Sequence, residues 1–267
     1  MGTPSTRRRG QELLNRAKEL DNLDLTIFVP CRNEAGNVGR ALNEIVTVLA
    51  TYAYTYEIIV IDDASVDTSV AEIEDFINNN TEILIILKKN HKPLGVSYNF
   101  VDAALLGRGQ YFRMIGGHFQ DRKEALQSVF DHLGKADIIF TYIHPDYRKP
   151  IRQFLSRSYT KLVNLVSGYK ITHYHGTPLH RRADIIRWHS YRSVGFYADI
   201  STRLLDEGVS YLEVPTIAYE RELGKSLALR WRNVISLLVG FADMFLRRFS
   251  KERIPPINLT AERDYSY

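Results

Sequence analysis

The chain has 267 residues, of which 45% are hydrophobic and 25% charged, with 35 Lys and Arg against 31 Asp and Glu. These proportions are typical of a folded globular protein and exclude a disordered or fibrous chain. The single cysteine, Cys31, excludes a disulfide framework and a cysteine-based zinc site, and it is compatible with a reducing cytosol. We recognise neither a signal peptide nor an apolar stretch of about 20 residues that would span a membrane.

Between residues 25 and 214, apolar runs rich in β-branched residues alternate with segments of helical spacing. The expected strands are 25–30, 56–61, 82–87, 111–115, 137–142 and 211–214. The expected helices are 37–52, 68–79, 97–106, 122–133, 151–168 and 197–207. This alternation predicts an α/β fold with three layers, in which helices cover both faces of a mostly parallel central sheet.

Polar clusters follow the first two expected strands. The first cluster is Pro30-Cys31-Arg32-Asn33-Glu34 and the second is Asp62-Asp63-Ala64-Ser65-Val66-Asp67. Ligands of such sheets bind beyond the carboxyl ends of the strands, where a carboxylate can accept hydrogen bonds from a nucleobase or a ribose. The alternative is that Asp63, Ser65 and Asp67 cap the following helix. Two such clusters after consecutive strands favour a binding site.

Several motifs together resemble the family-2 inverting glycosyltransferases of GT-A fold, and in particular the branch that acts on dolichyl and polyprenyl phosphates. The motifs are Val29–Glu34, Ile59–Asp67, Asn90 with Gly95 and Asn99, Gly195–Asp199, Glu213–Pro215 and Arg221–Ser226. The resemblance implies a GT-A (Rossmann-like) domain over 25–226, with a nucleotide-binding half (25–121) and an acceptor half (122–226). It leaves a basic helical arm at 1–24 and an amphipathic helix with a tail at 227–267.

The resemblance also implies roles for individual residues, with a nucleoside diphosphate sugar as the donor. The residues implied to hold the nucleoside are Pro30, Arg32, Glu34 and one or both of Asp62 and Asp63. Asp199 corresponds to the acidic residue near the acceptor, and it is the natural base if the acceptor is a hydroxyl. The loop with Arg221, Lys225 and Ser226 is implied to close over the diphosphate, whose oxygens need several donors.

The chain departs from the family where an Asp-x-Asp motif usually binds Mg²⁺ or Mn²⁺. Gly116, Gly117 and His118 stand there, followed by Gln120, so both carboxylates are missing. Since hard cations prefer carboxylate oxygen, the role of a metal is in question.

Three interpretations of this departure remain open. A metal is held by Asp63, His118, Gln120 or Asp121 together with the substrate's phosphates, or Arg221 and Lys225 replace it by offsetting the diphosphate charge. The third is an inactive sugar-nucleotide-binding protein. Glycines at 116 and 117 would let backbone N–H groups approach the diphosphate, which favours an altered metal dependence over inactivity.

Two acceptors fit the sequence. A polyprenyl phosphate is already anionic at pH 7 and needs cationic groups rather than a base; Arg152 and Arg157 are the candidates. A sugar hydroxyl, as in the assembly of cell-surface polysaccharide, requires Asp199 as the base. We expect the polyprenyl phosphate.

An apolar stripe at helical spacing runs through residues 227–249, with arginines toward both ends. It consists of Leu227, Trp231, Ile235, Leu238, Phe241, Phe245 and Phe249, with Arg230, Arg232, Arg247 and Arg248. Such a helix can lie in the headgroup layer of an anionic membrane, and core packing or a homodimer contact are the alternatives. We therefore expect a cytoplasmic protein that is peripheral on the inner face of the membrane. Nucleic acid is not expected as a partner, because the basic ends lack interleaved aromatic residues.

Overall fold

The computed structural model describes residues 23–174, 176–188, 195–218, 241–249 and 257–258. The predicted arm at 1–24 therefore lies outside the described residues except at its last two positions. The predicted phosphate loop at 221–226 and the first part of the C-terminal helix, 227–240, also lie outside them.

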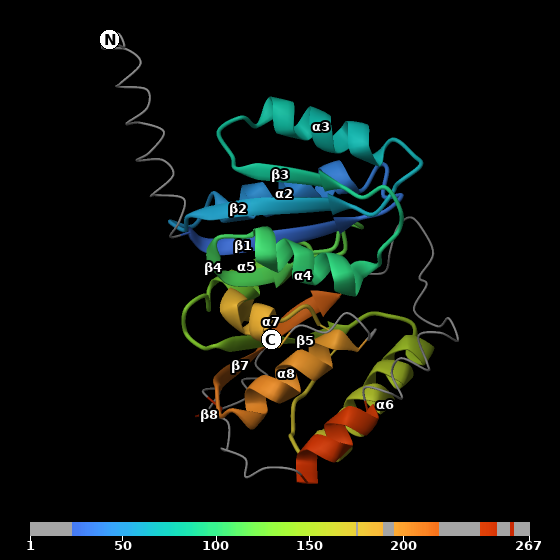
Figure 1. Cartoon of the computed structure of the whole chain (residues 1–267), viewed down its shortest axis with the longest axis vertical. Helices are drawn as coiled ribbons and strands as arrows, with labels where there is room; N and C mark the ends of the chain where they lie inside the picture. The colour runs from blue at the N-terminus through green and yellow to red at the C-terminus, as the bar shows by residue number, and fades with distance from the viewer. Residues whose placement is uncertain (1–22, 175, 189–194, 219–240, 250–256, 259–267) are drawn as a thin grey trace.

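The described strands form one sheet in the order β3-β2-β1-β4-β6-β5-β7-β8 (Figure 1). The strands are β1 (Leu23–Cys31), β2 (Tyr56–Asp62), β3 (Ile85–Lys89), β4 (Gly109–Met114), β5 (Ile138–Asp146), β6 (Leu179–Arg181), β7 (Ser210–Ala218) and β8 (Ile257–Asn258). The helices are α2 (Val38–Leu49), α3 (Ser69–Asn79), α4 (Val96–Leu106), α5 (Lys123–Phe130), α6 (Pro150–Ser167), α7 (Arg182–Arg187) and α8 (Phe196–Asp206). Residues 241–249 are also helical.

The α/β fold predicted from the sequence is confirmed. β1 pairs in parallel with β2 and β4, β2 with β3, and β5 with β7. Three short elements were not expected, namely helix α7, strand β6, which is antiparallel to both β4 and β5, and strand β8, which is parallel to β7. A strand of three residues is too short to show an alternating pattern, so the sequence carries no signal for β6.

Two apolar layers enclose the sheet. Along β1, Leu25, Ile27 and Val29 pack with α2 and α5, while Phe28 points to the other layer and contacts the rings of Phe100 and Phe112. Because β1 is buried on both faces, the loops that follow β1, β2 and β4 start from a rigid floor.

The second layer holds α4, α7 and α8 together with parts of α6 and 241–249. Within the part of the chain that the structure describes, no helix combines the length and the hydropathy needed to cross a bilayer.

Candidate functional site

The carboxyl ends of β1 and β2 lie side by side and bring the two predicted polar clusters together. Cys31 pairs in register with Asp62, and the Asp63 amide donates to the Cys31 carbonyl at 2.8 Å. Asp62 is 3% exposed; its Oδ2 accepts from the Ser65 amide at 3.1 Å. Its Oδ1 is buried and has no hydrogen-bond partner among the described residues. A buried carboxylate oxygen without a donor is costly, so this atom is a candidate acceptor for an N–H or O–H of a ligand or a water.

The loops after the two strands are fastened to each other. The Asn33 amide donates to Ser65 Oγ at 2.9 Å, and the Val66 amide donates back to Asn33 Oδ1 at the same distance. The Glu34 amide donates to Ser69 Oγ at 2.8 Å. Since Asn33 has a φ of 54°, a conformation that asparagine tolerates better than most residues, these bonds hold a turn that would otherwise be unfavourable. The two loops are therefore held in place by their own hydrogen bonds, without any ligand.

Asp63 is a structural residue in this arrangement. Its Oδ1 accepts from Asn90 Nδ2 at 2.9 Å and from the Leu94 amide at 2.8 Å, and its Oδ2 accepts from the Gly95 amide at 3.0 Å. Burial alone would raise the pKa of Asp63, but these hydrogen bonds outweigh it and hold the pKa below its usual value. Of the two adjacent aspartates, Asp62 is thus the one with a carboxylate oxygen that has no hydrogen-bond partner among the described residues.

Of the three residues weighed as helix caps, Asp67 bonds the start of α3, from the position before the N-cap residue Thr68. Its Oδ1 accepts from the Ser69 amide at 3.0 Å in the first turn of α3, and its Oδ2 accepts from the Ala35 amide at 3.1 Å. The three carboxylates of this cluster thus differ in role: Asp67 bonds the start of a helix, Asp63 anchors a loop, and Asp62 keeps one oxygen without a hydrogen-bond partner among the described residues.

The other residues expected around the nucleoside border the same floor. The Pro30 carbonyl accepts from Gly117, Arg32 is exposed, and Glu34 Oε2 accepts from Asn37 Nδ2 at 3.4 Å. Their contact with a nucleoside remains a prediction.

The glycines after β4 have a packing role. The Gly117 amide donates to the Pro30 carbonyl at 3.3 Å, and a Cβ at Gly117 would lie 2.8 Å from that oxygen. A Cβ at Gly116 would lie 2.1 Å from Cε1 of His118, so the imidazole packs directly on this glycine. In this structure the Gly117 N–H is directed to the end of β1, and the expected contact of Gly116 and Gly117 with a diphosphate remains a prediction. Glycine is needed here for the close approach of two backbones.

The donor set does not fit a resident divalent cation. Among the described residues, no three His, Cys, Asp or Glu side chains gather closely enough to hold a metal. His118 lies over Gly116, and Gln120 and Asp121 follow it, but together they supply one carboxylate where a hard cation prefers several. We derive no step of the reaction through a metal.

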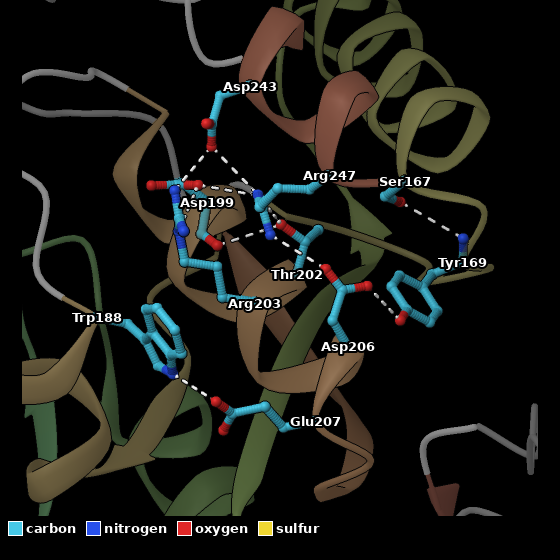
Figure 2. Close-up of polar contacts among 10 residues, drawn as sticks. All are labelled: Ser167, Tyr169, Trp188, Asp199, Thr202, Arg203, Asp206, Glu207, Asp243 and Arg247. Atoms are coloured by element: carbon cyan, nitrogen blue, oxygen red, sulfur yellow. Dashed lines mark hydrogen bonds and ion pairs between the residues drawn. The ribbon is translucent and has the colours of Figure 1, made fainter. Parts of the chain in front are cut away.

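Asp199 lies in the first turn of α8 and is held by arginines from two helices (Figure 2). Its Oδ1 accepts from Arg203 Nε at 3.1 Å and from Arg247 Nη2 at 3.0 Å. Asp243 Oδ2 accepts from both arginines, at 2.7 Å from Arg203 Nη2 and at 3.1 Å from Arg247 Nε. Burial raises the pKa of Asp199, and the two arginines oppose this shift. The result is a buried carboxylate with one oxygen firmly anchored.

Arg247 was expected among the arginines that meet lipid, and that expectation is wrong. Its guanidinium points inward and also donates to Asp206 Oδ2 at 3.1 Å and to Thr202 Oγ1 at 3.2 Å. Asp206 in turn accepts from the Tyr169 hydroxyl at 2.7 Å. Because Arg247 is 48 positions from Asp199 in the chain, no local pattern indicates the pairing. The spacing of four between Asp243 and Arg247 is the only trace of it in the sequence.

Arg152 and Arg157, predicted to hold an acceptor phosphate, both lie on α6. Arg157 is exposed and donates to Gln153 Oε1 at 3.2 Å, one turn away. On the same helix, the pKa of Tyr159 is raised first by burial and then by the charge of Asp199. Arg157 therefore belongs to the outer side of this helix.

Comparison with known proteins identifies the family. The profile described as glycosyl transferase family 2 matches residues 26–188, and the chain therefore belongs to this family. A mannosyltransferase from Pyrobaculum calidifontis, solved with GDP-mannose and Mn²⁺, superposes with a TM-score of 0.63 at 16% identity, covering 94% of this chain and 75% of that chain. The fold is thus the GT-A type of α/β fold.

Two curated relatives are similar in sequence. Dodecaprenyl-phosphate galacturonate synthase of Rhizobium johnstonii is 22% identical over 173 residues, which is 63% of this chain and 50% of that protein. An uncharacterized glycosyltransferase of Synechocystis is 26% identical over 153 residues, which is 56% of this chain and 47% of that protein. The chain spans about half the length of the curated relatives it matches.

Proposed function

We propose that this family-2 glycosyltransferase moves a sugar from a nucleoside diphosphate sugar to a polyprenyl phosphate, with inversion at the anomeric carbon. The observation that carries the donor half is the buried Oδ1 of Asp62, an acceptor without a donor at the joined carboxyl ends of β1 and β2. A nucleobase N–H or a ribose hydroxyl supplies the missing hydrogen bond.

The leaving group is a nucleoside diphosphate, whose negative charge grows as the bond to the sugar breaks. In our proposal Arg221, Lys225 and Ser226, which lie outside the described residues, donate to its oxygens. Arginine and lysine side chains suit this role because they donate hydrogen bonds to phosphate oxygens and offset the charge that develops on them.

The acceptor half rests on the similarity to a dodecaprenyl-phosphate galacturonate synthase. An oxygen of the lipid phosphate attacks the anomeric carbon opposite the diphosphate, and no proton has to be removed because the phosphate is already ionised. Asp199 then acts in placement: its Oδ1 fixes the guanidinium groups of Arg203 and Arg247, which also bond Asp243.

A second acceptor, a sugar hydroxyl, is favoured by one observation. Burial raises the pKa of Asp199, and a raised pKa is what a carboxylate needs to take a proton from a hydroxyl near neutral pH. Asp199→Asn separates the two cases: transfer to a hydroxyl acceptor should be nearly abolished, whereas transfer to a polyprenyl phosphate should fall only modestly. Unimpaired transfer to a hydroxyl acceptor by this variant would remove Asp199 from the role of base.

The donor site is tested by binding. Wild-type protein should be stabilised by one class among UDP-, GDP-, CDP- and dTDP-sugars in a thermal-shift panel, with and without Mn²⁺. Asp62→Asn should weaken the preferred nucleotide by about 10- to 100-fold, since a charged hydrogen bond contributes about 1.5–3 kcal/mol.

The matched control is Asp75→Asn, on the exposed side of α3, which should bind like wild type. Equal affinities of Asp62→Asn and wild type would show that the nucleoside lies elsewhere. A stabilisation that persists in EDTA would support a donor site that works without a metal.

A further inference from the structure

Helix α6 buries mainly polar side chains and exposes large apolar ones. Its buried face consists of Ser156, Thr160, Val163 and Ser167, of which three are polar. Its exposed apolar side chains are Ile151 at 62%, Phe154 at 65%, Leu155 at 41%, Leu162 at 42% and Leu165 at 71%. Positions 151, 155, 162 and 165 follow the helical repeat, so these side chains form one continuous stripe rather than scattered exceptions. A helix that places its small polar residues inside and its large apolar residues outside is expected to meet a second apolar phase.

The helical segment 241–249 repeats this arrangement. Met244 is buried and Arg247 points to Asp199, whereas Phe245, Leu246 and Phe249 are 50%, 69% and 72% exposed. The rings of Phe245 and Phe249 contact each other with centroids 4.9 Å apart. Their spacing of three and four residues places all three on one side of the helix.

The two helices lie side by side and combine into a single surface. The ring of Tyr159 on α6 contacts the ring of Phe241 with centroids 5.7 Å apart, and Arg248 Nη1 donates to the Leu165 carbonyl at 2.5 Å. Figure 1 shows α6 and the red segment 241–249 together at one edge of the molecule. We call the exposed apolar residues of α6 and of 241–249 the outer helix face.

The charged residues of α6 are of one sign. Helix α6 contains Arg152, Arg157 and Lys161 and no acidic residue, and Lys149 precedes it. Lys149, Arg157, Lys161 and Arg248 are all exposed. Lysine and arginine beside large apolar side chains are the composition of an interfacial helix that lies on anionic lipid.

We propose that the outer helix face docks on an anionic lipid bilayer, with the apolar side chains in the headgroup layer and the basic ones on lipid phosphates. A second copy of the chain fits less well, because a two-fold contact would set the same basic residues against themselves. This proposal rests on the proposed function, because docking on the bilayer brings the enzyme to a polyprenyl phosphate acceptor that is itself a component of the bilayer. Segment 241–249 then touches lipid on one side and Asp199 on the other. The acceptor phosphate therefore has to move from the bilayer surface toward Asp199 by the diameter of one helix, ~10 Å.

The test uses the full chain and vesicles of phosphatidylcholine and phosphatidylglycerol in equal parts, without any polyprenyl phosphate. Wild-type protein should co-sediment with them. Phe154→Ser combined with Leu165→Ser should lower the partition coefficient by about tenfold or more, while a thermal melt shows that the variant is folded. The matched control is Leu105→Ser on α4, where the side chain is 55% exposed, and its partitioning should equal that of wild type.

A charge variant sharpens the result. Arg157→Gln combined with Lys161→Gln should lower binding about tenfold on the anionic vesicles, with a much smaller effect on pure phosphatidylcholine. Wild type that fails to bind vesicles, or equal partitioning of Phe154→Ser/Leu165→Ser and wild type, would overturn the proposal. So would a dimer in sedimentation equilibrium that the same double variant converts to a monomer, because the face would then be covered by a second copy.

Transfer to a short, water-soluble prenyl phosphate separates this proposal from the proposed function. Phe154→Ser/Leu165→Ser should keep that transfer, because neither residue lies in the site. Vesicle binding without any transfer would contradict the proposed function and leave the docking surface intact.

Discussion

The two halves of the domain hold their key carboxylates by different means. In the half proposed to bind the nucleotide (25–121), Asp63 accepts from the backbone amides of Leu94 and Gly95 and from Asn90, all within the loops at one end of the sheet. In the half proposed to bind the acceptor (122–226), Asp199 is held by Arg203 and Arg247, and Arg247 comes from a helix near the C-terminal end of the chain. Backbone donors are fixed once the strands have paired, whereas the Arg247 contact forms only when a distant helix has docked on α8. The first half is therefore preorganised by its own fold, and the second depends on long-range assembly.

The largest loss of folding stability is expected for a substitution at Asp63. Asp63→Ala removes the acceptor for three hydrogen bonds in a buried place and should lower the free energy of unfolding by about 2–4 kcal/mol. Because the folded pKa of Asp63 is lowered, its contribution is present above the unfolded pKa, about 3.9, and is lost as the pH falls through the folded value. Urea unfolding of both proteins from pH 7 to pH 3 should show their difference shrinking below about pH 4.

The control for this measurement is Asp75→Ala on the exposed side of α3, which should stay within about 0.5 kcal/mol of wild type. A difference that does not change with pH would mean that the Asp63 carboxylate is not what anchors the loop.

The arginine-held half should respond next. Arg247→Ala leaves Asp199, 7% exposed, and Asp206 with fewer partners, and we expect a loss of about 2–3 kcal/mol in unfolding free energy. Arg248→Ala, one position on and exposed, should cost about 0.5 kcal/mol or less. If urea titrations gave equal losses for the two variants, the docking of segment 241–249 would not depend on the ion pairs to Asp199.

The smallest effect is expected at the close approach after β4. Gly117→Ala puts a methyl group 2.8 Å from the Pro30 carbonyl oxygen, which has to shift, at a cost of about 1–2 kcal/mol. Gly39→Ala in α2 meets nothing within 4 Å and should be neutral or stabilising by up to about 1 kcal/mol. Thermal melts of the two alanine variants should differ in sign, and a stable Gly117→Ala would show that the loop has room to move.

Much of the nucleotide-binding half could be predicted from the sequence. β1 and β2 are continuous apolar runs that stop at polar clusters, and the structure ends them at Cys31 and Asp62, within one residue of the expected bounds. The different roles of Asp62 and Asp63 could not be predicted from the sequence. They depend on the loop at 90–95, which folds back and donates hydrogen bonds to Asp63 only. The same holds for Gly117, where the neighbour that excludes a side chain is Pro30 on another strand.

The acceptor half was harder to predict for physical reasons. α8 and β7 carry clear patterns, but β6 is only three residues long and β8 only two, too short for any periodicity. The apolar stripe of the C-terminal helix was expected to form one face, yet Phe241 packs on Tyr159 while Phe245 and Phe249 remain exposed. Which side of an amphipathic helix faces the core is decided by the partner it meets, and that partner is remote in the chain.

The pairing of β8 with the start of β7 has a practical consequence for anyone trimming this protein. Ile257 on β8 lies opposite Ser210 on β7, and the amide and hydroxyl of Ser210 donate to Asp137 just before β5. The pairing of β8 therefore adds to contacts that connect β5, β7 and β8. A chain cut after residue 250 would lose this edge of the sheet along with what looks like a dispensable tail. Shortened versions made for crystallisation should therefore keep residues 257 and 258.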